Sequence, residues 1–141
     1  MPDRLPTPTT PLPLYEFLYW SQLADSQSPT AIGQILARAR PFNATHGITG
    51  LLVFDGQRFC QHLEGPAAAV EALMGRIAAD ERHSEVRIAY EGPLAERRYQ
   101  RFDMGYAQAD DPQEMEQLAL RRGADALQQF LALRPSFDIQ S

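Results

Sequence analysis

The feature that most constrains the fold is a pair of apolar segments, residues 47–54 and 57–64, joined at Asp55-Gly56. Large apolar residues dominate the first segment and recur through the second. An Asp-Gly dipeptide between such segments is a two-residue hairpin signal. We therefore expect two adjacent antiparallel strands in the middle of the chain. A hairpin is not stable alone, so flanking segments must cover at least one of its faces.

A segment with helical spacing lies on each side of this hairpin. The segment 26–40 begins with Ser and Pro, which favour a helix start, and Pro41 is expected to end or kink the helix near Arg40. A second helix is expected to open at Pro66 and to end near Asp80. The two apolar stripes consist of Ile32, Ile35, Leu36 and Ala39, and of Val70, Leu73, Met74 and Ile77.

Three further strands are expected, at residues 14–21, 85–91 and 101–107. The order strand, helix, strand, strand, helix, strand, followed by an extra strand, predicts an α+β, ferredoxin-like fold with a five-stranded mixed sheet. Right-handed crossovers place both helices on one face of that sheet. Two C-terminal helical stretches, 113–121 and 124–133, carry apolar stripes and are expected to cover the other face.

The 141 residues suit one folded domain, expected at 13–110, with a helical extension at 111–141. Residues 1–12 are Pro- and Thr-rich without an apolar core segment, so we expect a disordered lead-in rather than a signal peptide. No apolar run reaches the roughly 20 residues that span a bilayer. We therefore expect a cytoplasmic protein with no membrane partner.

Charge and reactive residues exclude several classes of function. The net charge is −5 and no basic stripe is present, which argues against a nucleic-acid partner. Cys60 is the single cysteine, so no intrachain disulfide is expected. The three histidines are scattered without paired ligands, so no metal site is expected. The Arg97-Arg98 pair is interpreted as solvated surface, and nothing indicates hydrolytic or redox catalysis.

Three polar residues fall on faces that should be apolar. Gln61 lies between Phe59 and Leu63 on one face of its strand, and Tyr19 shares a face with other aromatic residues. Asn43 would extend the apolar stripe of the first helix if that helix ran so far. Buried amides and phenols need hydrogen-bond partners. These three groups either satisfy one another or line a polar-edged ligand slot.

Four stretches together resemble a BLUF domain of the short, single-domain type, a blue-light sensor that uses FAD. They are LYWS, ILARARPFNATHGITGLLVFDGQRFCQHLEG, IAADERHSEVRI and ERRYQRFDMGYA, and the resemblance runs from about Leu14 to Tyr106. The combination of N-x-x-x-GITGLL, F-x-Q-x-LEG and D-x-RHS is specific. Many members carry a tryptophan two residues before the methionine of the last motif, where this chain has Phe102.

The resemblance implies a flavin held between the two helices, FAD in the first place, with FMN or riboflavin as alternatives. It implies that Tyr19 is photoactive, that Gln61 bridges Tyr19 and the flavin, and that Met104 lies near the glutamine on the last strand. It implies that Asn43 bonds the carbonyl and N3 edge of the ring. The further implied contacts are Ile35, Arg76, Asp80 and His83, with Arg76 and Asp80 toward the phosphate tail.

The resemblance also implies a photoreceptor and not an enzyme. Light would drive an electron and a proton from Tyr19, the proton by way of Gln61, and the hydrogen bonds would rearrange reversibly. The new state would pass to a downstream protein that the sequence does not identify, and a homo-oligomer is expected. The alternative is a light-insensitive ferredoxin-like module for protein interaction.

Overall fold

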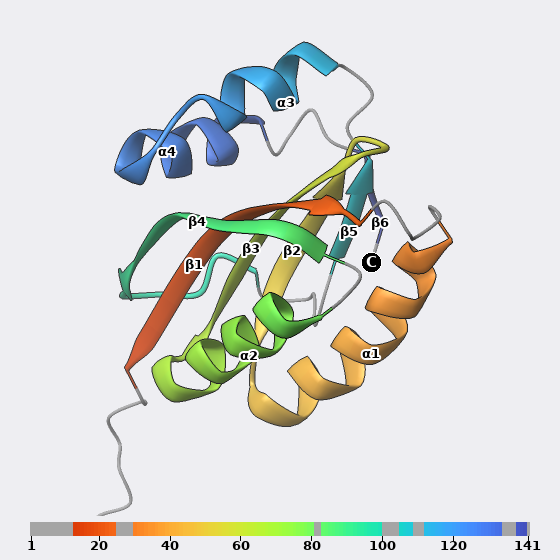
Figure 1. Ribbon diagram of the computed structural model, residues 1–141. Helices are drawn as coiled ribbons and strands as arrows, with labels where there is room; N and C mark the ends of the chain where they lie inside the picture. Colours follow the sequence, from red (N-terminus) through yellow and green to blue (C-terminus); the bar gives the residue numbers. More distant parts are fainter. Residues whose placement is uncertain are drawn as a thin grey trace, which may run out of the picture.

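The computed structural model describes residues 13–24, 30–80, 83–99, 105–108, 112–133 and 138–140. Its elements are β1 (Leu14–Leu23), α1 (Ala31–His46), β2 (Thr49–Phe54), β3 (Arg58–Pro66), α2 (Ala67–Ala79), β4 (His83–Leu94), β5 (Gly105–Gln108), α3 (Pro112–Ala119), α4 (Gly123–Leu133) and β6 (Asp138–Gln140). Helices α1 and α2 lie on one face of the sheet and α3 and α4 on the other (Figure 1). The predicted α+β fold with helices on both faces is confirmed.

The strands form one sheet in the order β4-β1-β3-β2-β5-β6. β1 pairs antiparallel with both β3 and β4, and β2 pairs antiparallel with β3, which is the ferredoxin-like arrangement. β5 adds in parallel to β2, so the sheet is mixed as predicted. Four of the five predicted strands are present, and β5 contains residues 105–107 of the fifth, predicted over 101–107, whose residues 101–104 lie outside the described ranges. The short β6, which no sequence pattern indicated, adds a sixth strand antiparallel to β5.

The hairpin between β2 and β3 is longer than its dipeptide suggested. Three residues, 55–57, separate the two strands, so the two-residue prediction was wrong. Gly56 has a positive φ of 106°, whereas a type I′ turn needs two such residues. The Asp55 side chain instead accepts hydrogen bonds from the backbone N–H groups of Gln57 and Arg58, at 3.0 and 2.7 Å. A side-chain cap of this kind stabilises the longer loop.

Helix α1 passes through Pro41 and ends at His46, so the first of the two expected outcomes, a helix end near Arg40, was wrong, and the alternative, a kink, stays a prediction. Proline removes one backbone hydrogen bond, at a cost of about 3 kcal/mol in a helix interior. The last turn is held in place by its own packing: within it, Asn43 is fully buried and Phe42 packs against the core of the α1/α2 face. The helix ends where Gly47 takes a φ of 70° and its N–H donates to the carbonyl of Asn43.

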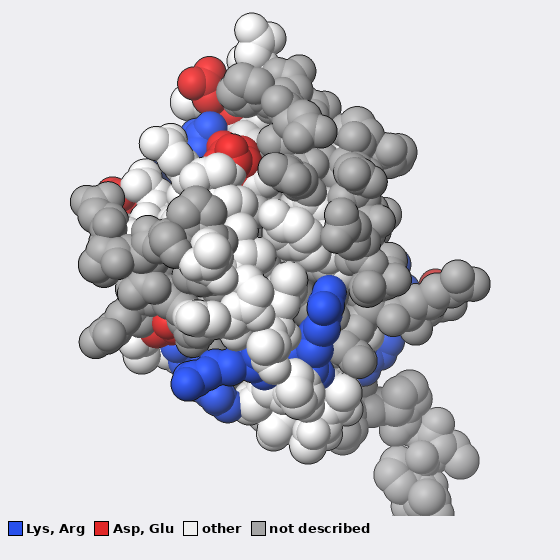
Figure 2. Space-filling view, turned by 90° about the vertical axis from the view of Figure 1, so that its right-hand side faces the viewer, with Lys and Arg blue, Asp and Glu red and all other residues white. Residues whose placement is uncertain are grey.

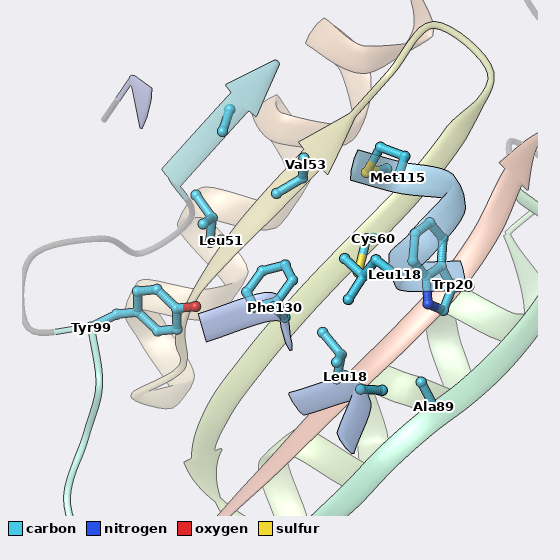
Figure 3. Packing of buried hydrophobic residues seen from close by; sticks show 12 residues of the cluster. Leu18, Trp20, Leu51, Val53, Cys60, Ala89, Tyr99, Met115, Leu118 and Phe130 are labelled. Atoms are coloured by element: carbon cyan, nitrogen blue, oxygen red, sulfur yellow. The ribbon is translucent and has the colours of Figure 1, made fainter. Parts of the chain in front are cut away.

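Each face of the sheet has its own apolar core. The α1/α2 face buries Phe17, Tyr19, Ile35, Ile48, Leu52, Phe54, Phe59, Leu63, Val70, Leu73, Met74 and Ile77. The α3/α4 face, drawn in Figure 3, buries Leu18, Trp20, Leu51, Val53, Cys60, Ala89, Tyr99, Ala107, Met115, Leu118, Ala126 and Phe130. The predicted covering role of the C-terminal helices is therefore confirmed. None of the helices in the described ranges is both long enough and apolar enough to cross a bilayer.

Candidate functional site

A single row of side chains crosses the sheet on the α1/α2 face. Tyr19 on β1 lies directly opposite Gln61 on β3, and Gln61 lies opposite Leu52 on β2. Tyr106 on β5 continues the row beside Leu52. Residues that are directly paired across a sheet have their side chains on the same face. The four side chains of this row, one from each of four strands, therefore lie between the sheet and helices α1 and α2. The strand register alone thus brings Tyr19 and Gln61 together.

Tyr19 and Gln61 form a buried hydrogen bond. The Tyr19 hydroxyl donates to the Gln61 Oε1 atom, and the two side chains are 0% and 3% exposed. Burial raises the pKa of the Tyr19 phenol well above its usual value, and the charges of Cys60 and Asp80 raise it further. The phenol therefore keeps its proton at neutral pH. A proton donor is thus held against an amide oxygen inside the core.

Helix α1 contributes Ile35 and Asn43, which are both buried against this core. The carbonyl of Asn43 accepts the capping N–H of Gly47 and, at 2.8 Å, the N–H of Ile48. These two bonds fix the backbone at the end of α1. The Asn43 amide is consequently a buried polar group on a rigid support, in the same layer as Tyr19 and Gln61.

The end of α2 lies against α1 through an aromatic contact. The Arg76 guanidinium carbon lies 4.2 Å from the centroid of the Phe42 ring, and that ring stacks on His46 at 4.0 Å. Arg76 is exposed, whereas Asp80, just after the helix, is half-buried and near enough to Tyr19 to affect its pKa. Arg76 and Asp80 therefore lie at the α2 end of the site.

Three residues singled out from the sequence lack a described side chain. His83 begins β4 and its backbone pairs with Leu23, but the position of its side chain is outside the description. Met104 and Phe102 lie between the described ranges 83–99 and 105–108. The roles implied for these three residues stay predictions.

A second polar cluster was missed from the sequence. Glu16, His62 and Glu64 are fully buried on the α3/α4 face, and the segment containing Arg98 and Tyr99 bonds to them. Arg98 is exposed and Arg97 is half-buried, which agrees with the surface interpretation of this pair, but both arginines also bond to neighbouring segments of the fold. The sequence signal that could have found the cluster is the one seen at Gln61. Glu16 shares one face of its strand with the apolar residues Leu18 and Trp20.

Comparison with known proteins identifies the family. The model of the BLUF family, described as sensors of blue-light using FAD, matches residues 14–105. The chain belongs to the BLUF family. Both the family resemblance and the ferredoxin-like fold expected from the sequence are thereby confirmed.

BLUF relatives include much longer proteins. The chain is 40% identical over 81 residues to the photoactivated adenylate cyclase subunit beta of Euglena gracilis, which covers 57% of this chain and 9% of the relative. It is 32% identical over 73 residues to the blue light- and temperature-regulated antirepressor BluF of Escherichia coli K12, covering 52% and 18%. The chain thus spans less than a fifth of the length of these relatives.

Solved BLUF structures agree with the fold over most of the chain. The ground state of BlsA matches with a TM-score of 0.72 and 27% identity, covering 85% of this chain and 86% of that one. The dark state of BlrB matches with a TM-score of 0.65 and 31% identity, covering 86% of both chains. Klebsiella pneumoniae BlrP1 with FMN and cyclic diGMP matches at 0.62 and 34%, covering 69% and 26%.

Proposed function

We propose that this protein is a blue-light receptor that binds an oxidised flavin non-covalently between α1 and α2. The observation that carries the proposal is the buried hydrogen bond from Tyr19 to Gln61, on a sheet face whose other buried side chains are mostly apolar. FAD is the first candidate because the family description names it, and BlrP1 with FMN supports FMN as an alternative. Riboflavin, which shares the same ring, is a further alternative.

The residues present suit the ring of a flavin. An isoalloxazine has apolar faces and one edge of alternating carbonyls and ring nitrogens, so it needs apolar walls and groups that both donate and accept. Ile35 and Leu73 supply apolar surface from the two helices. Gln61 and Asn43 supply buried amides, each of which has two donors and one acceptor oxygen. Asn43 would hold the carbonyl edge, and Gln61 would lie between the ring and Tyr19.

The charge near the two helices suits a phosphate-bearing tail. Helix α1 contains no acidic residue and carries Arg38 and Arg40, and α2 adds the exposed Arg76. Basic side chains cross the lower half of the face shown in Figure 2. Arginine binds phosphate through charge-assisted hydrogen bonds. Asp80 remains a candidate contact toward that tail, and His83 remains a candidate contact beside the outer end of the ring.

A bound flavin would supply the absorption of blue light and, in its excited state, the oxidising power of the first step. Tyr19 is the candidate donor, and loss of an electron makes a phenol strongly acidic, so its proton moves along the existing bond to Gln61 Oε1. Gln61, carrying the extra proton, would then turn, which exchanges its donor and acceptor ends. When the electron returns to Tyr19, Gln61 would give a proton back to the phenol oxygen from Oε1 or from Nε2, and so would end as the turned amide or as its tautomer. Electrons and protons are then restored, and only the arrangement of hydrogen bonds has changed.

The outcome is a reversible switch rather than turnover of a substrate, so we assign a sensor and not an enzyme. Met104, entering β5, is the proposed responder to the new state of Gln61. The state would then pass to a downstream protein or to a second copy of the chain, which fits the role of bistable elements in switches.

An absorption spectrum before and after blue illumination tests the proposal. The purified protein should be yellow, its bands should move slightly to the red in light, and they should return in the dark. A protein that stays colourless after flavin is added would instead support the light-insensitive interaction module.

A further inference from the structure

A buried polar cluster lies directly behind Gln61, on the α3/α4 face of the sheet. We call it the rear network, and its members are Glu16, His62, Glu64, Arg98 and Tyr99. His62 follows Gln61 on β3, so its side chain points to the opposite face. His62 is 0% exposed, and its ring therefore has protein on every side.

Both ring nitrogens of His62 are engaged. Nε2 lies 2.7 Å from Glu16 Oε1, and Nδ1 lies 2.7 Å from the Tyr99 hydroxyl oxygen. Burial opposes ionisation of Glu16, but hydrogen bonds from His62 and Arg98 outweigh it and hold the pKa of Glu16 below its usual value. A carboxylate only accepts, so Nε2 carries a proton toward Glu16. In the neutral ring, Nδ1 then accepts from the Tyr99 hydroxyl.

Glu64 holds the segment that contains Tyr99. Its carboxylate accepts the backbone N–H groups of Arg98 and Tyr99, at 2.7 and 3.1 Å. Glu64 also accepts from the Thr49 hydroxyl at 2.7 Å, which ties the same carboxylate to β2. Glu16 lies directly opposite Glu64 across β1 and β3, where two like charges are destabilising. The donors of residues 98 and 99, with His62, offset that repulsion.

The rear network also touches the C-terminal helices. The ring of His62 meets the ring of Phe130 on α4 edge-on, with centroids 5.5 Å apart, and meets Tyr99 in the same way at 5.2 Å. Figure 3 shows the Tyr99 hydroxyl directed toward the sheet beside Phe130. His62 is therefore in contact with Phe130 on α4 and with Tyr99, in the segment between β4 and β5. Gln61, the residue before it, faces α1 and α2.

We infer that His62 is a positioning residue that couples the state of Gln61 to α4 and to the segment entering β5. This inference rests on the proposed function. A rearrangement of Gln61 that shifts the β3 backbone must move the His62 ring, because the two residues share a peptide unit. The ring cannot move without displacing Tyr99 and Phe130, since packed interiors transmit displacement. The rear network is thus a second output path, on the face away from the flavin.

Tyr99→Phe tests this path, because it removes only the hydroxyl and keeps the ring against His62. The full chain with bound flavin should keep its red shift, since Tyr19 and Gln61 are untouched. The light-minus-dark difference in hydrogen exchange across α4 should fall about five-fold, the factor that corresponds to one lost hydrogen bond of about 1 kcal/mol. A merely structural role would raise exchange equally in light and dark and leave that difference unchanged.

Cys60→Ala is the matched control. Cys60 is the other chain neighbour of Gln61 and is buried on the same rear face, but it lies outside the rear network. Its variant should keep both the red shift and the exchange difference. Phe130→Leu, which keeps most of the apolar volume, is a second test and should lower the exchange response in α4 alone.

The outcomes separate the two proposals. Absence of a red shift in the wild type would contradict the proposed function. A normal red shift, with an exchange response in Tyr99→Phe and Phe130→Leu equal to that of the wild type, would overturn the coupling role and leave the photoreceptor intact. A red shift without any exchange response of α4 in the wild type would overturn it as well.

Discussion

The two faces of the sheet bury polar groups of different kinds. On the α1/α2 face, Tyr19 and Gln61 are neutral, and an amide can present either a donor or an acceptor at the same place. On the α3/α4 face, Glu16 and Glu64 are acids that accept bonds from several donors. A carboxylate only accepts and a guanidinium only donates, so those roles cannot be exchanged. The first face can exchange its hydrogen-bond partners at low cost, whereas the second keeps its partners and ties the strands to segment 97–99, so that a displacement of one is passed to the other.

The largest expected effect is a loss of stability when the rear network on the α3/α4 face is disrupted. Glu64→Leu leaves two backbone N–H groups and the Thr49 hydroxyl without their acceptor, so it should lower the free energy of unfolding by about 3 kcal/mol or more. Urea denaturation measures this loss. Glu91→Leu is the control, because Glu91 is exposed and bonds only to the Tyr15 hydroxyl among the contacts described. Equal losses in both variants would remove the contrast between the faces.

The corresponding change on the α1/α2 face should be mild for stability and severe for function. Tyr19→Phe removes one buried hydrogen bond, so we expect a loss of about 1 kcal/mol in the free energy of unfolding. The red shift should disappear, because the proton donor is gone. Tyr106→Phe, in the same row across the sheet, should keep the red shift. A full red shift in Tyr19→Phe would show that Tyr19 is not the donor.

The pH dependence of stability separates the faces more finely. The pKa of Glu16 is lowered in the folded protein, so its contribution is present above its unfolded value, about 4.5, and is lost as pH falls through the lower folded value. Stability should therefore decline in acid below about pH 4.5, and Glu16→Gln should decline less steeply over that window. Unfolding curves at a series of pH values measure this. Parallel profiles for the two proteins would contradict a lowered pKa for Glu16.

The smallest effect concerns the helix over the proposed flavin site. Pro41→Ala restores a backbone donor within α1 and should raise the free energy of unfolding by about 1 kcal/mol or less, because the extra freedom of the unfolded chain offsets part of the gain. Thermal unfolding measures the change. A lower melting temperature would indicate that Pro41 stabilises the last turn of α1.

Much of the α1/α2 face could be predicted from the sequence, because its signal is local. Strand alternation placed Gln61 on one face with Phe59 and Leu63. Helical spacing places Asn43 on the apolar stripe of the first helix, provided that the helix continues past Pro41. The continuation through Pro41 could not be predicted, because packing of the last turn outweighs the local effect of proline. Propensity is a weak guide where tertiary contacts decide.

The rear network was harder to predict for a different reason. Its donors at residues 98 and 99 belong to an irregular segment, and they meet Glu64 34 and 35 positions away in the chain. Only the register of β1 and β3 sets Glu16 opposite Glu64. The sequence shows that Glu16 is a polar residue on an apolar strand face, but it does not show which residues bond to it.

The most direct test of the central proposal is the light-minus-dark absorption spectrum of Gln61→Leu beside that of the wild type. Leucine fills a similar volume but can neither donate nor accept, so the variant should still bind flavin. We expect a small, reversible red shift in the wild type and none in Gln61→Leu. A full red shift in Gln61→Leu would contradict the proposal that the amide between Tyr19 and the flavin is the switch.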